Sequence, residues 1–138
     1  MSMDGHPATR PEVKISATDG AYCVAFAGLM REAHPDTWFV PLINEAHGRA
    51  VNDRLREVVL DIRQLSYANA AAWKCLVYWL KRMHQDSRAG YQLRILCEQA
   101  HSWQHVGMPA LRVFGGERLV IDVYDGGKMI ADAGRAIQ

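Results

Sequence analysis

The sequence has no apolar run approaching the roughly 20 residues that a membrane-spanning helix needs. Its first eleven residues also lack the apolar segment of a secretory signal. We therefore expect a cytoplasmic protein without membrane insertion. Residues 1–11 are rich in proline and small side chains, so we predict that they form a flexible leader.

An excess of one charge is also missing. The 16 Lys and Arg residues nearly balance the 15 Asp and Glu residues, which leaves a formal net charge of +1. Proteins that bind nucleic acids or anionic membranes usually present a strongly basic surface. The sequence therefore gives no electrostatic reason to expect either as a partner.

Cysteine is scarce, and no two cysteines have the CxxC spacing that is typical of redox and zinc sites. Cys23, Cys75 and Cys97 each lie in an apolar segment, where a free thiol behaves as a small hydrophobic side chain. We predict that all three are reduced residues of the core.

Motifs that hold cofactors are absent as well. The pairs Gly115-Gly116 and Gly126-Gly127 have neither the Lys-Ser/Thr of a P-loop nor GxGxxG spacing, so we predict turns and no cofactor. His101 and His105 are four residues apart, as two metal ligands on a helix would be, and Glu98 is close by. No third distant ligand follows in an obvious motif, so we expect no metal. A small metal- or ligand-binding α/β protein that uses these residues is the alternative.

What the sequence does contain is one globular domain, residues 12–138, of ordinary size and 49% hydrophobic residues. Alternating or apolar runs predict strands at 13–17, 21–27, 58–62, 91–97 and 118–124. Helices are predicted from a cap at Asp36 or Thr37 to about Asn52, with Pro41 in the first turn, and after Asn69. A short helix over 102–106, closed by Gly107 and Pro109, and a terminal helical turn around 128–133 complete the order. This order predicts an α/β fold with a mixed sheet of four to five strands and about four helices.

The segment from Glu57 to Met83 is the most informative part of the sequence. Its strand has apolar residues on both faces, as expected of a central strand that is covered on both sides or lies in a mainly parallel sheet. Asn69 then precedes three alanines, Trp73 and a helix whose apolar residues recur three and four apart. The turn contains no nucleophile, glycine or carboxylate. Alanine is the best helix former and asparagine a good N-cap, so we predict that Asn69 caps this helix.

This order of elements, together with Leu-Asp-Ile at 60–62 and Leu-Ser-Tyr-Ala-Asn-Ala-Ala-Ala-Trp at 65–73, resembles the STAS domain, the family of anti-sigma factor antagonists. The resemblance covers most of the chain, from about residue 13 to 133. In that family the turn after the central strand typically reads Asp-Ser-Ser-Gly-Leu. Here the five matching positions are occupied by Asn69, Ala70, Ala71, Ala72 and Trp73. Val106-Gly107-Met108 resembles the Gly-Leu that follows the family's third helix. Residues 120–124 resemble its last strand.

The resemblance implies a non-enzymatic regulator that acts by binding a protein. Family members bind a histidine-kinase-like Ser/Thr kinase that doubles as an anti-sigma factor, and they are phosphorylated on a serine of that turn. Alanine cannot accept a phosphoryl group, so we expect a docking surface without this switch. The expected partner-binding residues are Asn69, Ala70, Ala71, Ala72, Trp73 and Val77. Ser66 is the nearest alternative phosphoacceptor.

Several alternatives remain open at this point. The chain also fits a STAS subunit of a lipid-transport ABC ATPase complex, which stabilises the ATPase and does not switch. Trp73 is either a packing residue under a neighbouring segment or an interface anchor, since tryptophan is enriched in binding hot spots. A homodimer whose interface covers Trp73 is a further possibility.

Overall fold

The computed structural model describes residues 10–18 and 20–132. Its centre is a six-stranded mixed sheet in which strand order follows chain order. The strands are β1 (Glu12–Thr18), β2 (Ala21–Met30), β3 (Glu57–Ala68), β4 (Gln92–Glu98), β5 (Leu119–Asp125) and β6 (Lys128–Asp132). Strands β2 to β5 run parallel, whereas the outer strands β1 and β6 are antiparallel to their neighbours. Of the predicted flexible leader, residues 1–9 lie outside the described residues.

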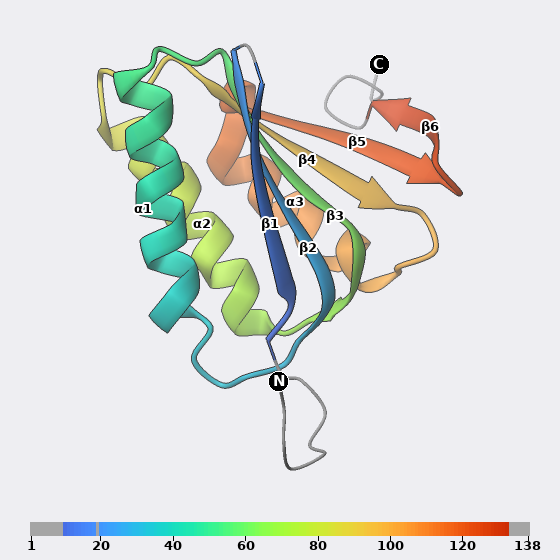
Figure 1. Ribbon diagram of the computed structural model, residues 1–138. Helices are drawn as coiled ribbons and strands as arrows, with labels where there is room; N and C mark the ends of the chain where they lie inside the picture. Colours follow the sequence, from blue (N-terminus) through green and yellow to red (C-terminus); the bar gives the residue numbers. More distant parts are fainter. Residues whose placement is uncertain (1–9, 19, 133–138) are drawn as a thin grey trace.

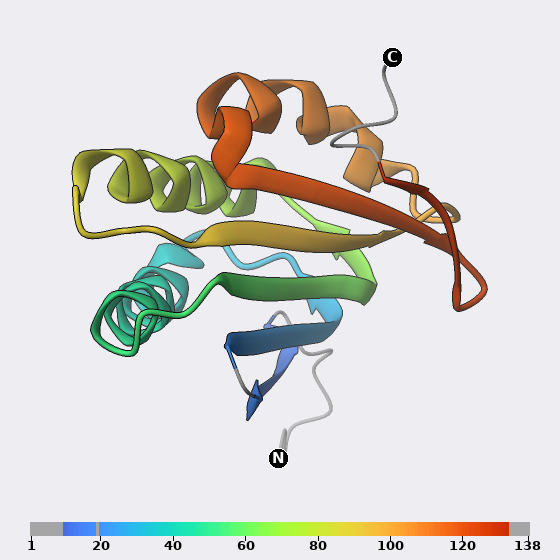
Figure 2. The ribbon, with the colours of Figure 1, turned by 90° about the horizontal axis from the view of Figure 1, so that it is seen from above.

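Three helices connect the parallel strands: α1 (Asp36–Asn52), α2 (Ala70–Gln85) and α3 (Trp103–Gly115). Parallel strands that advance in one direction through crossovers of one hand place every connecting helix on the same face. The helices follow the twist of the sheet, so that α1 lies near β2 and α3 near β5 (Figures 1 and 2). None of the described helices is long and apolar enough to cross a membrane.

The hydrophobic core lies between these helices and one face of the sheet. Register places Tyr22, Val58, Leu93 and Leu119 side by side on four strands, and all four are buried. Along β3, buried residues alternate with half-buried or exposed ones. Of the two expectations for this strand, a place in a mainly parallel sheet is confirmed, because β2 to β5 run parallel. Cover on both faces is wrong: among the described residues, helices cover only one face.

The five predicted strands are all present, and β3 extends six residues beyond its predicted end at 62. It continues because β2 is equally extended and pairs with it as far as Met30 and Ala68. Helix α1 begins near the predicted residue, but Pro35 occupies the N-cap position and makes no side-chain cap bond. Pro41 is the sixth helical residue and so lies beyond the first turn, contrary to the prediction.

Helix α3 is much longer than the segment 102–106 predicted from the sequence. Gly107 and Pro109 were expected to end it, yet both lie inside the helix. A Cβ atom added at Gly107 would overlap the indole of Trp73, so this glycine serves the close approach of α3 to α2. Pro109 removes one backbone hydrogen bond from the helix. The helix nevertheless continues past it, because the burial of Met108 and Leu111 on either side stabilises this segment.

The last described element is a strand and not the predicted helical turn. Residues 128–132 form strand β6, paired antiparallel to β5, where a helical turn around 128–133 was expected. The reason is the turn between them: Gly126 and Gly127 both have positive φ, of 61° and 91°, which suits a tight hairpin. The sheet therefore has six strands and the described chain three α-helices, with a short 3-10 turn at Gly116–Arg118.

The cysteines are free thiols, as predicted. Burial raises the pKa of Cys75 to about 11 and that of Cys97 to about 12. Both thiols are therefore protonated at neutral pH and behave as core residues. The prediction that Cys23 is a core residue is wrong: it is only half-buried, because its side chain lies on the face of the sheet that no described helix covers.

Candidate functional site

The start of helix α2 lies at the carboxyl end of the central strand. Strand β3 ends at Ala68, and Asn69 follows in an extended conformation with φ −86° and ψ 178°. Its Oδ1 accepts a hydrogen bond from the backbone N–H of Ala72 at 3.2 Å. The predicted N-cap is therefore confirmed, and it satisfies one of the otherwise free amides of the first helical turn.

Asn69 also ties the helix to a distant segment. Its Nδ2 donates to the backbone carbonyl of Glu32 at 2.9 Å, and its own backbone N–H donates to the carbonyl of Met30 at 3.2 Å. An aspartate would reproduce the cap but has no N–H for the Glu32 carbonyl. The Asn69 side chain therefore also binds the loop after β2 to the start of α2.

The three alanines have different surroundings. Ala70 is exposed, Ala71 is half-buried, and Ala72 is buried against the core. Of the two positions that resemble the family's serines, Ala70 is thus the more accessible. Ala72 faces inward, so a larger side chain there would disturb the core before it met a partner.

Trp73 packs between α2 and α3. Its ring meets the ring of Trp103 edge-on, with a centroid separation of 5.7 Å and an interplanar angle of 61°. The backbone at Gly107 lies against the same indole. Trp73 is nevertheless only half-buried, so it is a packing residue that also contributes to the surface beside the helix start.

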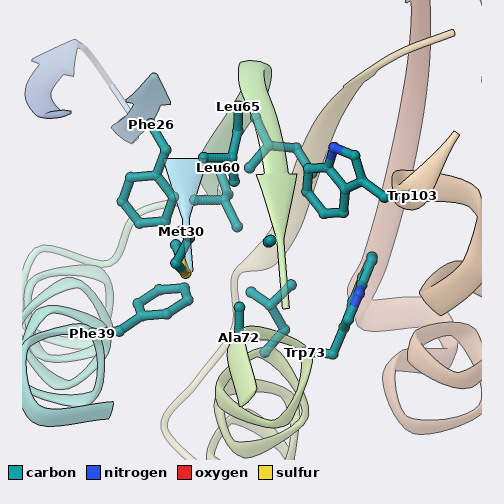
Figure 3. A pocket seen from close by; sticks show the side chains of 11 residues that line it. Phe26, Met30, Phe39, Leu60, Leu65, Ala72, Trp73 and Trp103 are labelled. Atoms are coloured by element: carbon teal, nitrogen blue, oxygen red, sulfur yellow. The ribbon is translucent and has the colours of Figure 1, made fainter. Parts of the chain in front are cut away.

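Beneath Trp73 is a small apolar cavity (Figure 3). Trp73 and Trp103 face Phe26 and Phe39 across it. Its volume is about 20 Å³, close to the space of one water molecule, and no polar atom contributes to its lining surface. A dry void of this size has no groups to orient a substrate, so we assign it to core packing. Its remaining lining residues are Met30, Leu60, Ile62, Leu65, Ala68, Ala72 and Leu76.

A shallow groove runs along the outer side of α2. Trp73, Lys74, Val77, Tyr78 and Lys81 line it. Val77 is half-buried and both lysines are exposed. Five of the six predicted partner-binding residues therefore reach the surface on or beside this groove, the exception being Ala72.

The outer face of α3 is also apolar, which sequence reasoning missed. Val106 and Val113 are 80% and 82% exposed, and Ala110 between them is exposed too. Phe114 is 39% exposed, and the ammonium of Lys81 lies 5.2 Å from the centre of its ring. Val106, Ala110 and Val113 are spaced as residues on one face of a helix. The helix predicted from the sequence ended at residue 106, so this face was not predicted.

Ser66 is exposed on β3, three residues before the cap. It is therefore accessible, but it does not occupy the first turn of α2, where the family carries its phosphoacceptor. Its phosphorylation stays an untested prediction.

The histidines do not form a ligand cluster. Only His105 is in α3, because the helix begins at Trp103, and His101 precedes it. His101 Nε2 lies 3.1 Å from the carbonyl of Arg63, whereas His105 Nε2 lies 3.4 Å from the carbonyl of Gln99. Glu98 accepts a hydrogen bond from the backbone of Gly126. Within the described residues, no group of three His, Cys, Asp or Glu side chains is arranged to hold a metal ion.

A buried polar chain lies at the other end of α2. Trp79 Nε1 donates to the hydroxyl oxygen of Tyr91 at 3.0 Å, and that hydroxyl lies 2.7 Å from His47 Nδ1. His47 Nε2 lies 2.8 Å from Asp86 Oδ2. Hydrogen bonds from Arg88 and then from His47 hold the pKa of Asp86 far below its usual range. Tyr91 is fully buried, and burial raises its pKa to about 12, so this chain of hydrogen bonds stabilises the fold.

The acidic residue of the central strand is also occupied. Both carboxylate oxygens of Asp61 accept hydrogen bonds from the guanidinium of Arg63, at 2.9 and 2.8 Å. The same guanidinium lies 4.5 Å from the centre of the Tyr124 ring. Asp61 therefore acts as an ion-pair partner on the face of the sheet that no described helix covers.

No family model matches the sequence, and no curated protein matches it. A solved structure with a similar fold is described as an anti-sigma factor antagonist from Mycobacterium paratuberculosis. The two structures align with a TM-score of 0.55 at 15% sequence identity, over 83% of this chain and 89% of the other. The α/β, STAS-like single-domain fold predicted from the sequence is thereby confirmed.

Proposed function

We propose that this chain is a non-enzymatic regulatory module that binds a protein partner in the cytoplasm through the start of α2. The supporting observation is the capped helix at the carboxyl end of β3, whose first residue, Ala70, is exposed. The similar fold of an anti-sigma factor antagonist supports a regulatory role for this surface. The proposed contact residues are Asn69, Ala70, Ala71, Trp73 and Val77, with Ala72 supporting them from the core.

The proposed module has no phosphoryl switch at this turn. A phosphoryl group would add about −1.5 to −2 charges at a surface that a partner must cover, and would oppose docking. Ala70 and Ala71 have no hydroxyl to carry one. Binding is therefore constitutive in this proposal, and the amount of each protein sets how much complex forms. The proposed partner is a histidine-kinase-like Ser/Thr kinase that acts as an anti-sigma factor.

A STAS subunit of a lipid-transport ABC ATPase complex is the second candidate. Such a subunit stabilises its ATPase and needs no phosphoacceptor, which agrees with alanine at positions 70 and 71. The two candidates predict different partners. Affinity purification of the full chain from its native extract, followed by mass spectrometry, separates them by recovering either a kinase or an ABC-type ATPase.

The test of the docking surface is an Ala70→Asp variant in the same purification. Aspartate in the first turn of a helix interacts favourably with the helix dipole, so the fold should tolerate it. Its charge would nevertheless be buried against a bound partner. We expect at least a tenfold loss of the partner recovered by the wild type. Ser87→Asp is the matched control, because Ser87 is exposed beyond the other end of α2. Equal recovery with Ala70→Asp and wild type contradicts the proposal.

A further inference from the structure

Helices α2 and α3 are unusual in their charge. Together they carry four Lys or Arg residues and no Asp or Glu, in a chain whose 16 basic and 15 acidic residues nearly balance as a whole. Lys74 and Lys81 are exposed on the outer side of α2 and line its groove. Neither takes part in the ion pairs found among the described residues. Both ammonium groups are thus available to an acidic partner.

Between and beside these lysines the surface is apolar. Val77 lies between them on α2, and Val106, Ala110 and Val113 form an exposed stripe on α3. The contacts of Trp73 with Trp103 and of Lys81 with Phe114 connect the two helices. We call the nine residues Ala70, Trp73, Lys74, Val77, Lys81, Val106, Ala110, Val113 and Phe114 the α2–α3 surface.

We propose that the α2–α3 surface binds an amphipathic helix of the partner, whose apolar side covers the valines and whose acidic side faces Lys74 and Lys81. This inference rests on the proposed function for the existence of a protein partner, and it adds the chemistry of the partner's binding element. Helices that dock into apolar grooves present side chains at spacings of three and four residues. The two lysines are seven residues apart, which is about 10 Å along α2 and matches two turns of a docked helix.

The shape of the surface favours a helix over a flat lipid surface. The groove on α2 has a volume of about 430 Å³ and is bordered by Lys74, Tyr78 and Lys81. A convex helix can bury side chains in such a groove, whereas a bilayer contacts protruding residues first. Two lysines also supply little attraction to an anionic membrane, whereas segments that bind such membranes typically present clusters of about four to eight basic residues. We therefore commit to an acidic amphipathic helix as the occupant.

The test uses a synthetic helical peptide and the full chain. The peptide has leucines at spacings of three and four residues, flanked by glutamates, with a staple on its opposite face. A sister peptide has lysine in place of each glutamate. Fluorescence anisotropy at low salt should show at least tenfold tighter binding of the glutamate peptide, with a smaller difference at high salt.

Variants of the chain make the test specific. Lys74→Glu/Lys81→Glu should weaken the glutamate peptide at least tenfold and strengthen the lysine peptide. Lys14→Glu/Arg54→Glu makes the same change of charge on exposed residues of β1 and the α1–β3 turn, and should alter neither. Circular dichroism confirms that each variant is folded. Equal affinity of the chain for the two peptides, or an equal effect of both double variants, overturns the inference.

Other occupants give distinct results. Binding to phosphatidylglycerol vesicles that the glutamate peptide cannot displace would assign the surface to lipid and overturn the inference. A dimer in sedimentation that Val113→Asp converts to monomer would assign it to a second copy, with the same consequence. If Ala70→Asp abolishes recovery of the native partner while Lys74→Glu/Lys81→Glu leaves it unchanged, only this inference fails. If Ala70→Asp has no effect on that recovery, the proposed function itself fails.

Discussion

Asn69 and Glu32 are 37 residues apart in sequence and are joined by a hydrogen bond of 2.9 Å from the Asn69 amide to the Glu32 carbonyl. The link crosses from the start of α2 to the loop after β2. It thus stabilises two segments that border the proposed docking site. The other half of the same side chain caps α2.

Replacing Asn69 should reveal these two contributions separately. Asn69→Ala loses both the cap and the link, and we expect a loss of about 2 kcal/mol in the free energy of unfolding. Asn69→Ser keeps a cap acceptor but cannot reach Glu32, so about half of that loss should remain. Urea denaturation measures both values. Equal stability of the serine variant and wild type would show that the link to Glu32 contributes nothing.

Gly107→Ala tests the contact between α3 and α2. An added methyl group overlaps the Trp73 indole, so we expect a destabilisation of about 1–3 kcal/mol although alanine favours helix. Gly48→Ala is the matched control, since a Cβ at Gly48 in α1 meets no atom within 4 Å. That variant should be stabilised by up to about 1 kcal/mol.

A double-variant cycle completes this test. In a Trp73→Ala background the overlap is gone, so Gly107→Ala should become neutral or stabilising. Thermal unfolding of the four proteins gives the coupling energy. A Gly107→Ala effect that is unchanged without the indole would contradict close packing of α3 on Trp73.

The contrast between what was predictable and what was missed follows from the range of each interaction. Strands β1 to β5 and the Asn69 cap depend on alternation and on neighbours within a few residues, and the sequence displays both. Gly107 looks like a helix end locally, because the reason for it, Trp73, lies 34 positions earlier. His47 and Tyr91 are 44 residues apart, and nothing near either residue indicates their contact. At the candidate site the cap was predictable, while the link to Glu32 and the apolar outer face of α3 depended on tertiary structure.

Because of Asp86, the fold should become less stable at acid pH. Hydrogen bonds from Arg88 and His47 lower its pKa in the folded chain below the ordinary value of 3.8. A carboxyl group with a lowered folded pKa contributes stability that is present above its unfolded pKa and is lost as pH falls through the folded value. Asp86→Asn removes the charge and replaces one of the two acceptor oxygens with an NH2 donor, so one of the two groups of hydrogen bonds from His47 and Arg88 is lost with it. We expect this variant to be less stable than wild type at pH 7.

The size of that difference should depend on pH. As the pH falls below the ordinary pKa of 3.8, the Asp86 carboxylate of the unfolded chain takes up a proton while that of the folded chain keeps its charge. The stabilisation therefore decreases, and the two proteins should become more similar in stability. Urea midpoints of wild type and Asp86→Asn, measured from pH 7 down to pH 3, give the comparison. A gap between the two midpoints that stays constant over this range would contradict a stabilising charge at Asp86.

The absence of a phosphoryl switch can be tested once the partner is purified. Wild type incubated with a partner kinase and ATP should show no added phosphoryl group by intact-mass measurement, because Ala70 and Ala71 lack hydroxyls. Ala70→Ser places a hydroxyl on the exposed first residue of α2, and it should gain one phosphoryl group and lose affinity for the partner by about tenfold or more. Ser66→Ala is the control for the exposed serine of β3. A phosphoryl group on wild type that disappears in Ser66→Ala would move the switch to that strand and contradict constitutive binding.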